Sequence, residues 1–279
     1  MTAPPASPAL IPELRVLALK GASMAGELLA EGQSEVRQVR AKSSAVDAVT
    51  QMDIASEQAL VAFIRRHRPD DSILGEEGGE QVGSSPVRWV IDPLDGTVNY
   101  LYGLPAWAVS VGVELDGVTI AGAVVAPGLD EAFHAGSGHG AVLDRPEADD
   151  YGQRLHVRAP VPLELALLAT GFGYRADRRA YQAQVIAGLL PKVRDIRRVG
   201  AAALDLCWLA AGRFDAYFER GLQPWDSCAG TLIAREAGAV VTGLGEPDPT
   251  PALAVGASSA DLHQHLCAEL DAARALAGP

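Results

Sequence analysis

The amino-acid sequence predicts a mixed α/β protein built from two closely packed lobes. In the first half, apolar residues recur at helical spacing, and two β-rich runs follow, from Trp107 to Leu115 and from Val118 to Ala126. Asp116-Gly117 joins these runs, which is a strong signal for a tight hairpin. From Leu163 onwards, short apolar runs alternate with helical patterns. We therefore expect helices and an antiparallel sheet first, and alternating strands and helices second.

The first half opens with two predicted amphipathic helices. The first carries apolar and small residues three and four positions apart: Leu10, Leu14, Leu17, Ala18, Gly21, Ala25 and Leu28. The second carries Ile54, Leu60 and Ile64 and should end before Pro69, which cannot donate a backbone hydrogen bond. Beyond the hairpin we expect short strands at residues 131–135, 140–143 and 154–157, with an exposed acidic loop at residues 145–152.

The second half is predicted to alternate to the end of the chain. Strands are expected at residues 165–170, 196–199, 214–219, 239–242 and 253–257, and helices at 178–190, 201–211, 226–237 and 260–276. Ser258 or Ser259 would cap the last helix. The sequence shows no fixed-period repeat and no linker polar enough to separate independent domains. We divide it into a disordered tail of residues 1–8, a first lobe of residues 9–160 and a second lobe of residues 161–279.

The composition indicates a soluble globular protein. Of 279 residues, 48% are hydrophobic and 21% are charged, which supports a large core. The net charge of −12 disfavours a broad basic surface, so neither a nucleic-acid polymer nor a membrane is an expected partner. An anionic substrate would need local help. A bound divalent metal could give that help by inverting the local charge.

The cysteines and the N-terminus suggest a reducing compartment. Cys207, Cys228 and Cys267 are scattered in apolar segments without C-x-x-C spacing, so reduced thiols are expected. The first residues show no basic region before an apolar block, as a signal peptide would. No stretch approaches the run of about 18 apolar residues that a membrane span needs. We therefore expect a cytoplasmic protein.

The stretch from Trp89 to Tyr100, W-V-I-D-P-L-D-G-T-V-N-Y, places two carboxylates after an apolar run. The predicted strand at Val87 to Ile91 ends where polar groups begin, and Pro93 fixes φ directly after Asp92, so the chain should turn at Asp92. Asp92 and Asp95 on such a turn can converge on one Mg²⁺ ion, which takes oxygen ligands, water and substrate phosphate.

Gly96 and Thr97 follow the two aspartates directly and could bind phosphate. Glycine lets backbone N–H groups approach an anion, threonine offers a hydroxyl, and a helix starting here would point its positive end at a phosphate. The alternative is an ordinary surface turn, because Asp, Pro and Gly are common turn residues. Gly75-Glu76-Glu77-Gly78 upstream and Trp225-Asp226 downstream favour a site.

These motifs together resemble those of the inositol monophosphatase family of metal-dependent sugar phosphatases. The chain has G-E-E from Gly75, D-P-L-D-G-T-x-N from Asp92 and W-D from Trp225, in the family's order. The resemblance covers the chain from about Leu14 to about Leu270. It implies a layered αβαβα sandwich of two intimately packed lobes with the active site between them. It also implies a homodimer and inhibition by lithium.

The resemblance implies a site for two or three Mg²⁺ ions. Glu76, Asp92 and the backbone carbonyl of Leu94 would hold the ion that activates water. Asp92, Asp95 and Asp226 would hold the second ion, so that Asp92 bridges the two. Metal-assisted phosphate hydrolysis generally uses several carboxylates around ions about 3.5 to 4 Å apart, which these four acids could supply.

The resemblance also implies catalytic and phosphate-binding roles. Thr97, together with Glu76, would orient the attacking water, and Asp92 is the third catalytic candidate. The N–H groups of Gly96 and Thr97 would hold phosphate oxygens, and Asp95 would touch both metal and substrate.

Two further acids, Asp47 and Asp53, resemble residues of the family that approach the metal-binding loop, which corresponds here to Asp92–Thr97 and is called the metal loop below. Thr50-x-x-Asp53 also matches a helix capping box, so a capping role and a role at the site both stay open.

Substrate recognition is implied for Glu219, which would accept hydrogen bonds from inositol hydroxyls, and for Ala202, which would pack beside the ring. Two departures from the family pattern leave the substrate open. Ala201 stands where many members carry Ser or Thr, and Tyr174 stands where many carry a small polar residue.

We therefore expect a Mg²⁺-dependent phosphomonoesterase for a small polyol or sugar phosphate, with inositol monophosphate as the first substrate. The alternatives are a histidinol-phosphate phosphatase or a 3′-phosphoadenosine nucleotide phosphatase with the same metal chemistry. A non-catalytic regulatory binding protein is the alternative from another class.

Overall fold

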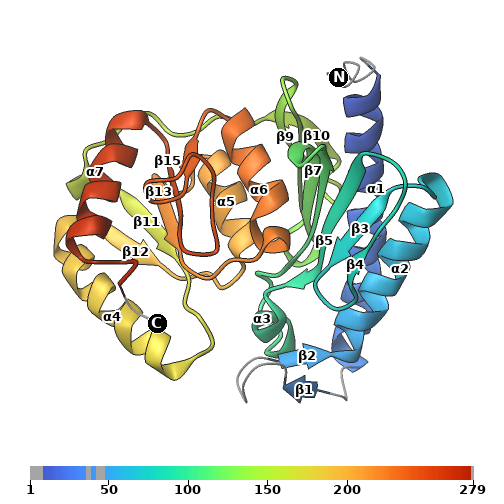
Figure 1. Cartoon of the computed structure of the whole chain (residues 1–279), viewed down its shortest axis with the longest axis horizontal. Helices are drawn as coiled ribbons and strands as arrows, with labels where there is room; N and C mark the ends of the chain where they lie inside the picture. Colours follow the sequence, from blue (N-terminus) through green and yellow to red (C-terminus); the bar gives the residue numbers. More distant parts are fainter. Residues whose placement is uncertain (1–8, 36–38, 42–47, 278–279) are drawn as a thin grey trace.

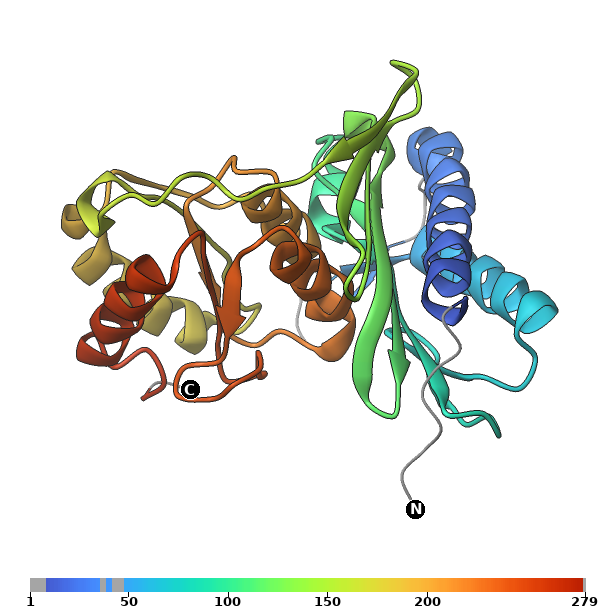
Figure 2. The same cartoon turned by 90° about the horizontal axis from the view of Figure 1, so that it is seen from above.

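The computed structural model describes residues 9–35, 39–41 and 48–277. These residues form five layers in which helices and sheets alternate (Figures 1 and 2). The expected layered αβαβα sandwich is thereby confirmed. The described helices include none that is long and apolar enough to cross a membrane. Cys207, Cys228 and Cys267 are free thiols.

The first layer consists of two helices, α1 (Leu10–Gly32) and α2 (Gln51–His67). The buried residues of α1 lie three and four positions apart, as the apolar spacing predicted, and α1 packs against β6 and β7. Helix α2 ends just before Pro69, as expected. A short antiparallel pair, β1 (Val39–Ala41) and β2 (Ala48–Thr50), connects the two helices.

The second layer is an eight-stranded sheet in the order β10-β9-β8-β7-β6-β5-β3-β4. Its strands are β3 (Ser72–Gly75), β4 (Gly79–Gln81), β5 (Val87–Asp95), β6 (Ala108–Leu115), β7 (Val118–Ala126), β8 (Glu131–Gly136), β9 (Gly140–Arg145) and β10 (Asp150–Arg154). Neighbouring strands are antiparallel except β3 and β5, which are parallel. The predicted hairpin joins β6 to β7, with Asp116 at φ 52° and Gly117 at φ 80°, the conformation that a two-residue turn requires.

The prediction of a strand at residues 154–157 is wrong. A strand forms instead at Asp150–Arg154 as β10, which begins inside the segment that was expected to be an exposed acidic loop. Strand β10 pairs only with β9 at the edge of the sheet, and all five of its residues are exposed. An edge strand without a buried face carries no apolar alternation, so the sequence gives little sign of it.

The middle layer consists of α5 (Ala202–Ala210) and α6 (Pro224–Glu236), which pack on the face of the first sheet opposite α1 (Figure 2). Two glycines of the sheet allow α6 to approach closely. A Cβ on Gly112 would lie 2.3 Å from Cys228 Sγ, and one on Gly122 would lie 3.0 Å from Ala229 Cβ. The N-terminal half of α6 is thus held close to the first sheet, which contains Asp92 and Asp95.

The fourth layer is a five-stranded sheet in the order β12-β11-β13-β15-β14, and the fifth is a pair of helices. The strands are β11 (Leu167–Thr170), β12 (Asp195–Arg197), β13 (Ala216–Glu219), β14 (Val240–Thr242) and β15 (Ala254–Ala257). Helices α4 (Ala176–Leu189) and α7 (Ala260–Ala272) cover the outer face (Figure 1). Ser259 caps α7 by accepting a hydrogen bond from Leu262 N.

Candidate active site

The sequence predicted a strand from Val87 to Ile91 and a turn at Asp92. In the structure, strand β5 continues to Asp95. Asp92 pairs with Ser110 of β6 and Asp95 pairs with Ala108, so three steps along β5 match two steps along β6. On a regular strand, side chains three positions apart point to opposite faces. The one extra residue of this bulge returns both carboxylates to the same side. Pro93, which has no N–H to donate, lies within the irregular segment.

The short helix α3 (Thr97–Leu101) follows the bulge directly. Gly96 precedes it with φ 89°, a left-handed conformation that favours glycine. Its Cβ position would also lie only 3.1 Å from the backbone oxygen of Ala106. Glycine is therefore required here on two counts, and the chain can turn sharply from the strand into the helix.

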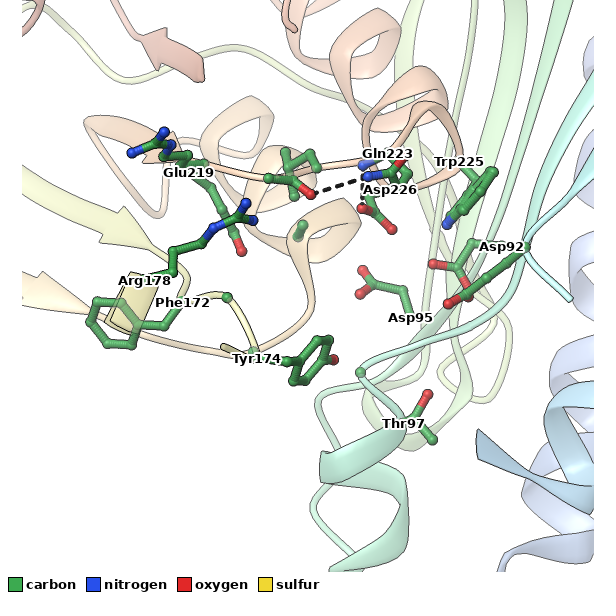
Figure 3. Close-up of a pocket in the computed structure, with 18 of the residues that line it drawn as sticks. Asp92, Asp95, Thr97, Phe172, Tyr174, Arg178, Glu219, Gln223, Trp225 and Asp226 are labelled. Carbon is green, nitrogen blue, oxygen red and sulfur yellow. Dashed lines mark hydrogen bonds between the residues drawn. The ribbon is translucent and has the colours of Figure 1, made fainter. Parts of the chain in front are cut away.

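All the predicted site residues meet at one cavity of about 320 Å³ between the two sheets (Figure 3). The cavity is lined by the following predicted residues: Glu76, Asp92, Leu94, Asp95, Gly96, Thr97, Ala202, Glu219 and Asp226. They come from the first sheet, the middle helices and the second sheet. The structure therefore joins motifs that are far apart in the sequence.

Backbone N–H groups fix three of the carboxylates. Asp92 Oδ1 accepts from Leu94 N at 2.9 Å, and Asp226 Oδ2 accepts from Gln223 N at 2.7 Å in a capping box at the start of α6. Asp95 Oδ2 accepts from Ala203 N at 2.8 Å, a bond that links the end of strand β5 to helix α5. Each acid is thus oriented by a rigid element before any ligand binds.

The acids destabilise one another's charged forms. Burial raises the pKa of Asp92 well above its usual value, and the charges of Glu76, Asp95 and Asp226 raise it further. Burial also raises the pKa of Asp95 to about 7, although its backbone hydrogen bond acts in the opposite direction. A divalent cation among these carboxylates would remove the repulsion.

The donor set fits Mg²⁺, because it consists of hard oxygen ligands. Within the residues that the structure describes, no group of three or more His, Cys, Asp or Glu side chains is placed so that it could hold a metal ion. The carboxylates instead line an open cavity. This suits an ion that keeps part of its coordination for water and substrate phosphate.

Asp53 contacts Thr97, the first residue of helix α3. Its side chain is fully buried in the first turn of α2, and its Oδ1 accepts a hydrogen bond from Thr97 Oγ1 at 3.0 Å. Thr97 Oγ1 also lies 3.1 Å from the carbonyl oxygen of Leu94, a second acceptor for the same hydrogen. Asp53 therefore contacts a residue that lines the cavity. Asp47 lies outside the described residues.

Two residues of α2 that sequence reasoning missed bind backbone groups beside the predicted acids, one in strand β5 and one in the turn from β3 to β4. Ser56 Oγ donates to Pro93 O at 2.9 Å, and Glu57 Oε2 accepts from Glu77 N at 2.8 Å. Both lie on the buried face of α2 with Asp53, at positions i, i+3 and i+4. The sequence contained a signal for them. Asp53, Ser56 and Glu57 fall on the same helix face as the apolar Leu60, and polar residues on a buried face need hydrogen-bond partners.

Glu219 is held at the end of β13 in the second lobe. The hydroxyl of the buried Tyr217 donates to Glu219 Oε2 at 3.0 Å. A Cβ on Gly171 would lie within 2.0 to 2.3 Å of the Glu219 carboxyl atoms, so the absence of a side chain there makes room for the carboxylate. Burial raises the pKa of Glu219 to about 7, while Tyr217 and the charge of Arg198 counteract this rise.

Comparison with known proteins shows similarity over almost the whole chain. A model of the "Inositol monophosphatase family" matches residues 12–275. An "Inositol-1-monophosphatase" of Mycobacterium leprae is 51% identical over 209 residues, which cover 73% of this chain and 70% of that protein. A "Nus factor SuhB" of Pasteurella multocida is 40% identical over 228 residues, which cover 81% and 83%. The solved structure "Mycobacterium tuberculosis SuhB" has a TM-score of 0.81 and 40% identity and covers 95% of this chain and 98% of that one.

Proposed function

The chain belongs to the inositol monophosphatase family, a family of phosphoric monoester hydrolases, and we propose that it is a Mg²⁺-dependent phosphomonoesterase for a small polyol or sugar phosphate. Inositol monophosphate is the first substrate that we propose. One observation carries the proposal: Glu76, Asp92, Asp95 and Asp226 line a single cavity that Thr97 also lines.

The metal ligands that we propose are the predicted ones: Glu76, Asp92, Asp95 and Asp226, with the carbonyl oxygen of Leu94. Bound Mg²⁺ would polarise the phosphoryl group and lower the pKa of a water molecule. The N–H groups of Gly96 and Thr97 would hold the phosphate oxygens, since both residues line the cavity beside the acids.

Thr97 would orient the attacking water as an acceptor. Its single hydroxyl hydrogen is directed to Asp53 or to the Leu94 carbonyl, so the lone pairs of Oγ1 remain to accept a hydrogen from water. Glu76 would accept the other hydrogen of that water. Asp53 thus acts through Thr97 and fixes the direction of its hydroxyl.

Glu219 and Ala202 would bind the alcohol portion of the substrate. A carboxylate held by Tyr217 can accept hydrogen bonds from ring hydroxyls, and the small side chain of Ala202 leaves space beside the ring. Tyr174, which is 44% exposed at the cavity wall, adds an aromatic face. That face could stack on the adenine of a 3′-phosphoadenosine nucleotide or on the imidazole of histidinol phosphate, the two alternative substrates.

A screen of phosphate release tests this function. Inositol, histidinol, fructose and nucleotide phosphates would be compared with Mg²⁺ and with a chelator. We expect turnover of at least one of them, and only with the metal. Absence of Mg²⁺-dependent turnover for every substrate would contradict the proposal and would favour the non-catalytic binding role.

We further propose that the protein is a homodimer in the cytoplasm and that lithium inhibits it. Membership of the family supports all three parts of this proposal. The division into lobes of residues 9–160 and 161–279 assigns the metal loop to the first lobe, and substrate recognition and Asp226 to the second.

A further inference from the structure

Asn99 binds a segment that lies 100 residues later in the chain. It belongs to α3, two positions after Thr97, and is only 5% exposed. Its side-chain nitrogen Nδ2 donates to the carbonyl oxygen of Ala106 at 2.6 Å and to that of Val199 at 3.0 Å. Both hydrogens of the amide group are therefore used, one on the connection that leads to β6 and one on the connection from β12 to α5.

The segment that Asn99 holds is part of the cavity wall. Arg198 and Gly200, the two neighbours of Val199, line the cavity, and so does Ala202 at the start of α5. Among the residues that the structure describes, Asn99 is not one that lines this cavity. Its hydrogen bond therefore fixes the position of lining residues, while its own side chain stays out of reach of a substrate.

The two backbones meet closely beside Asn99. A Cβ on Gly96 would lie 3.2 Å from Ala201 Cβ and 3.3 Å from Gly200 O, and one on Gly200 would lie 3.2 Å from Asn99 Nδ2. Both glycines also have positive φ, 89° and 98°, a conformation that favours glycine. The hydrogen bond from Asn99 to Val199 thus lies at a point where the metal loop and the β12–α5 connection are in direct contact.

A second hydrogen bond spans the same contact, from Ala203 N to Asp95 Oδ2 at 2.8 Å. Asp95 is one of the metal ligands that we propose, so a change of Asp95 would alter the metal site as well as the contact. Asn99 is not a proposed ligand. It can therefore be replaced while every proposed ligand stays in place, which separates the spacing of the cavity walls from the metal chemistry.

We propose that Asn99 is a positioning residue that sets the distance between the two ends of the cavity. The inference rests on the proposed phosphomonoesterase function. In that function, the N–H groups of Gly96 and Thr97 form the phosphate end, and Ala202 and Glu219 form the alcohol end. A substrate that is held at both ends needs the correct distance, because a misplacement of about 1 Å can cost about 10²-fold in rate. A substrate held by its phosphate alone does not depend on this distance.

Two substrates measure the effect on each protein. We compare kcat/KM for inositol monophosphate, whose hydroxyls reach the alcohol end, with kcat/KM for a simple aryl phosphate, which has no such hydroxyls. Asn99→Ala should lower the ratio of the first value to the second by about tenfold, the loss expected when the alcohol contacts are removed. Asn99→Ser keeps one hydroxyl hydrogen for two carbonyl groups, so its loss should be smaller. This variant decides the matter if Asn99→Ala does not fold.

Tyr100→Phe is the matched control. Tyr100 follows Asn99 in α3, is buried, and donates its hydroxyl hydrogen to Leu29 O at 2.7 Å. The change removes a buried hydrogen bond of the same helix, but one that leads to α1 and not to the alcohol end. It should lower the melting temperature and keep the parent ratio. An equal fall of the ratio in Tyr100→Phe would overturn the proposal, because any loosening of α3 would then have the same effect.

A double variant tests whether Asn99 acts through the alcohol end. In the Asn99→Ala background, Glu219 is no longer held at the correct distance, so Glu219→Gln should cost less for inositol monophosphate than it costs in the parent. Fully additive losses would overturn the positioning role. So would an unchanged ratio of the two substrates, or equal losses on both.

Thermal unfolding gives a readout that needs no turnover. Mg²⁺ should raise the melting temperature of Asn99→Ala by as much as it raises that of the parent, because the proposed ligands are unchanged. Loss of this increase would place Asn99 in the support of the metal site and would overturn the proposal. Failure of the proposed function would show separately, as absence of turnover of every monoester by the parent protein.

Discussion

Asp53 and Thr97 lie 44 residues apart in the sequence, yet the hydroxyl of Thr97 donates to the carboxylate of Asp53 at 3.0 Å. The bond joins the first turn of α2 to the first residue of α3, at the point where the metal loop ends. Because a hydroxyl has one hydrogen, its direction, toward Asp53 or toward the Leu94 carbonyl, decides which side of Thr97 can accept a hydrogen bond from water.

The first prediction concerns this pair. Thr97→Ala should lower kcat by about 10² to 10⁴-fold with little change in KM, because the hydroxyl orients water rather than substrate. Asp53→Asn should lower kcat less, and the double variant should be no worse than Thr97→Ala alone, since both act on one hydroxyl. Thr97→Ser is the control and should retain most of the activity. Additive losses in the double variant would show that Asp53 acts independently of Thr97.

The second prediction concerns Asp92. Asp92→Asn should lower kcat/KM by more than about 10²-fold, because the proposed role of Asp92 is to bridge both ions. The same change removes a buried charge that Glu76, Asp95 and Asp226 repel, so the metal-free variant should unfold at the same or a higher temperature than the metal-free parent. Stability and phosphate release are measured on the same preparation. A variant with parental activity would exclude Asp92 as a ligand.

The third prediction separates alcohol recognition from phosphate chemistry. Glu219→Gln should cost about tenfold or more in kcat/KM for inositol monophosphate, because the carboxylate accepts hydroxyl hydrogen bonds. A simple aryl phosphate has no such hydroxyls, and its turnover should change less. Tyr217→Phe removes only the hydroxyl that holds Glu219, so it should show a weaker effect in the same direction.

The outcomes for Glu219 are distinct. Parallel losses on both substrates would place Glu219 in the metal site or in the fold. No loss on either substrate would remove Glu219 from the site and weaken the assignment of inositol.

The fourth prediction is a pH dependence of stability in the metal-free protein. The pKa values of Asp95 and Glu219 are raised to about 7, and that of Asp92 is raised as well. In the unfolded chain such carboxyls titrate at about 4. Between pH of about 4 and about 7 the folded protein therefore binds more protons than the unfolded chain, so its stability falls as pH rises through this window.

Thermal unfolding with a chelator at several pH values measures this effect. Mg²⁺ should raise the melting temperature strongly at pH 8, where the carboxylates are charged, and weakly at pH 5. Metal-free stability that stays flat or increases between pH 5 and pH 7 would contradict the prediction. So would an equal effect of Mg²⁺ at both pH values.

Local sequence accounts for much of the fold. Contiguous signals such as Asp116-Gly117, which fixes a turn through its own backbone preferences, identified the β6–β7 hairpin. Helical spacing identified α1, whose buried face follows the pattern of its apolar residues. The edge strand β10 was placed wrongly, because it buries no face and so leaves no pattern to read.

The sequence by itself identified the acids Glu76, Asp92, Asp95, Asp226 and Glu219 as candidates for one site, and all five line the cavity. Only the tertiary structure decided how they are arranged. The bulge that aligns Asp92 with Asp95 depends on pairing with β6, and the hydrogen bond from Thr97 to Asp53 joins two helices that are far apart in the sequence. Both features are contacts between segments that are far apart in the chain. The pattern of neighbouring residues indicates which conformation a segment prefers, but it does not indicate which other segment will pack against it.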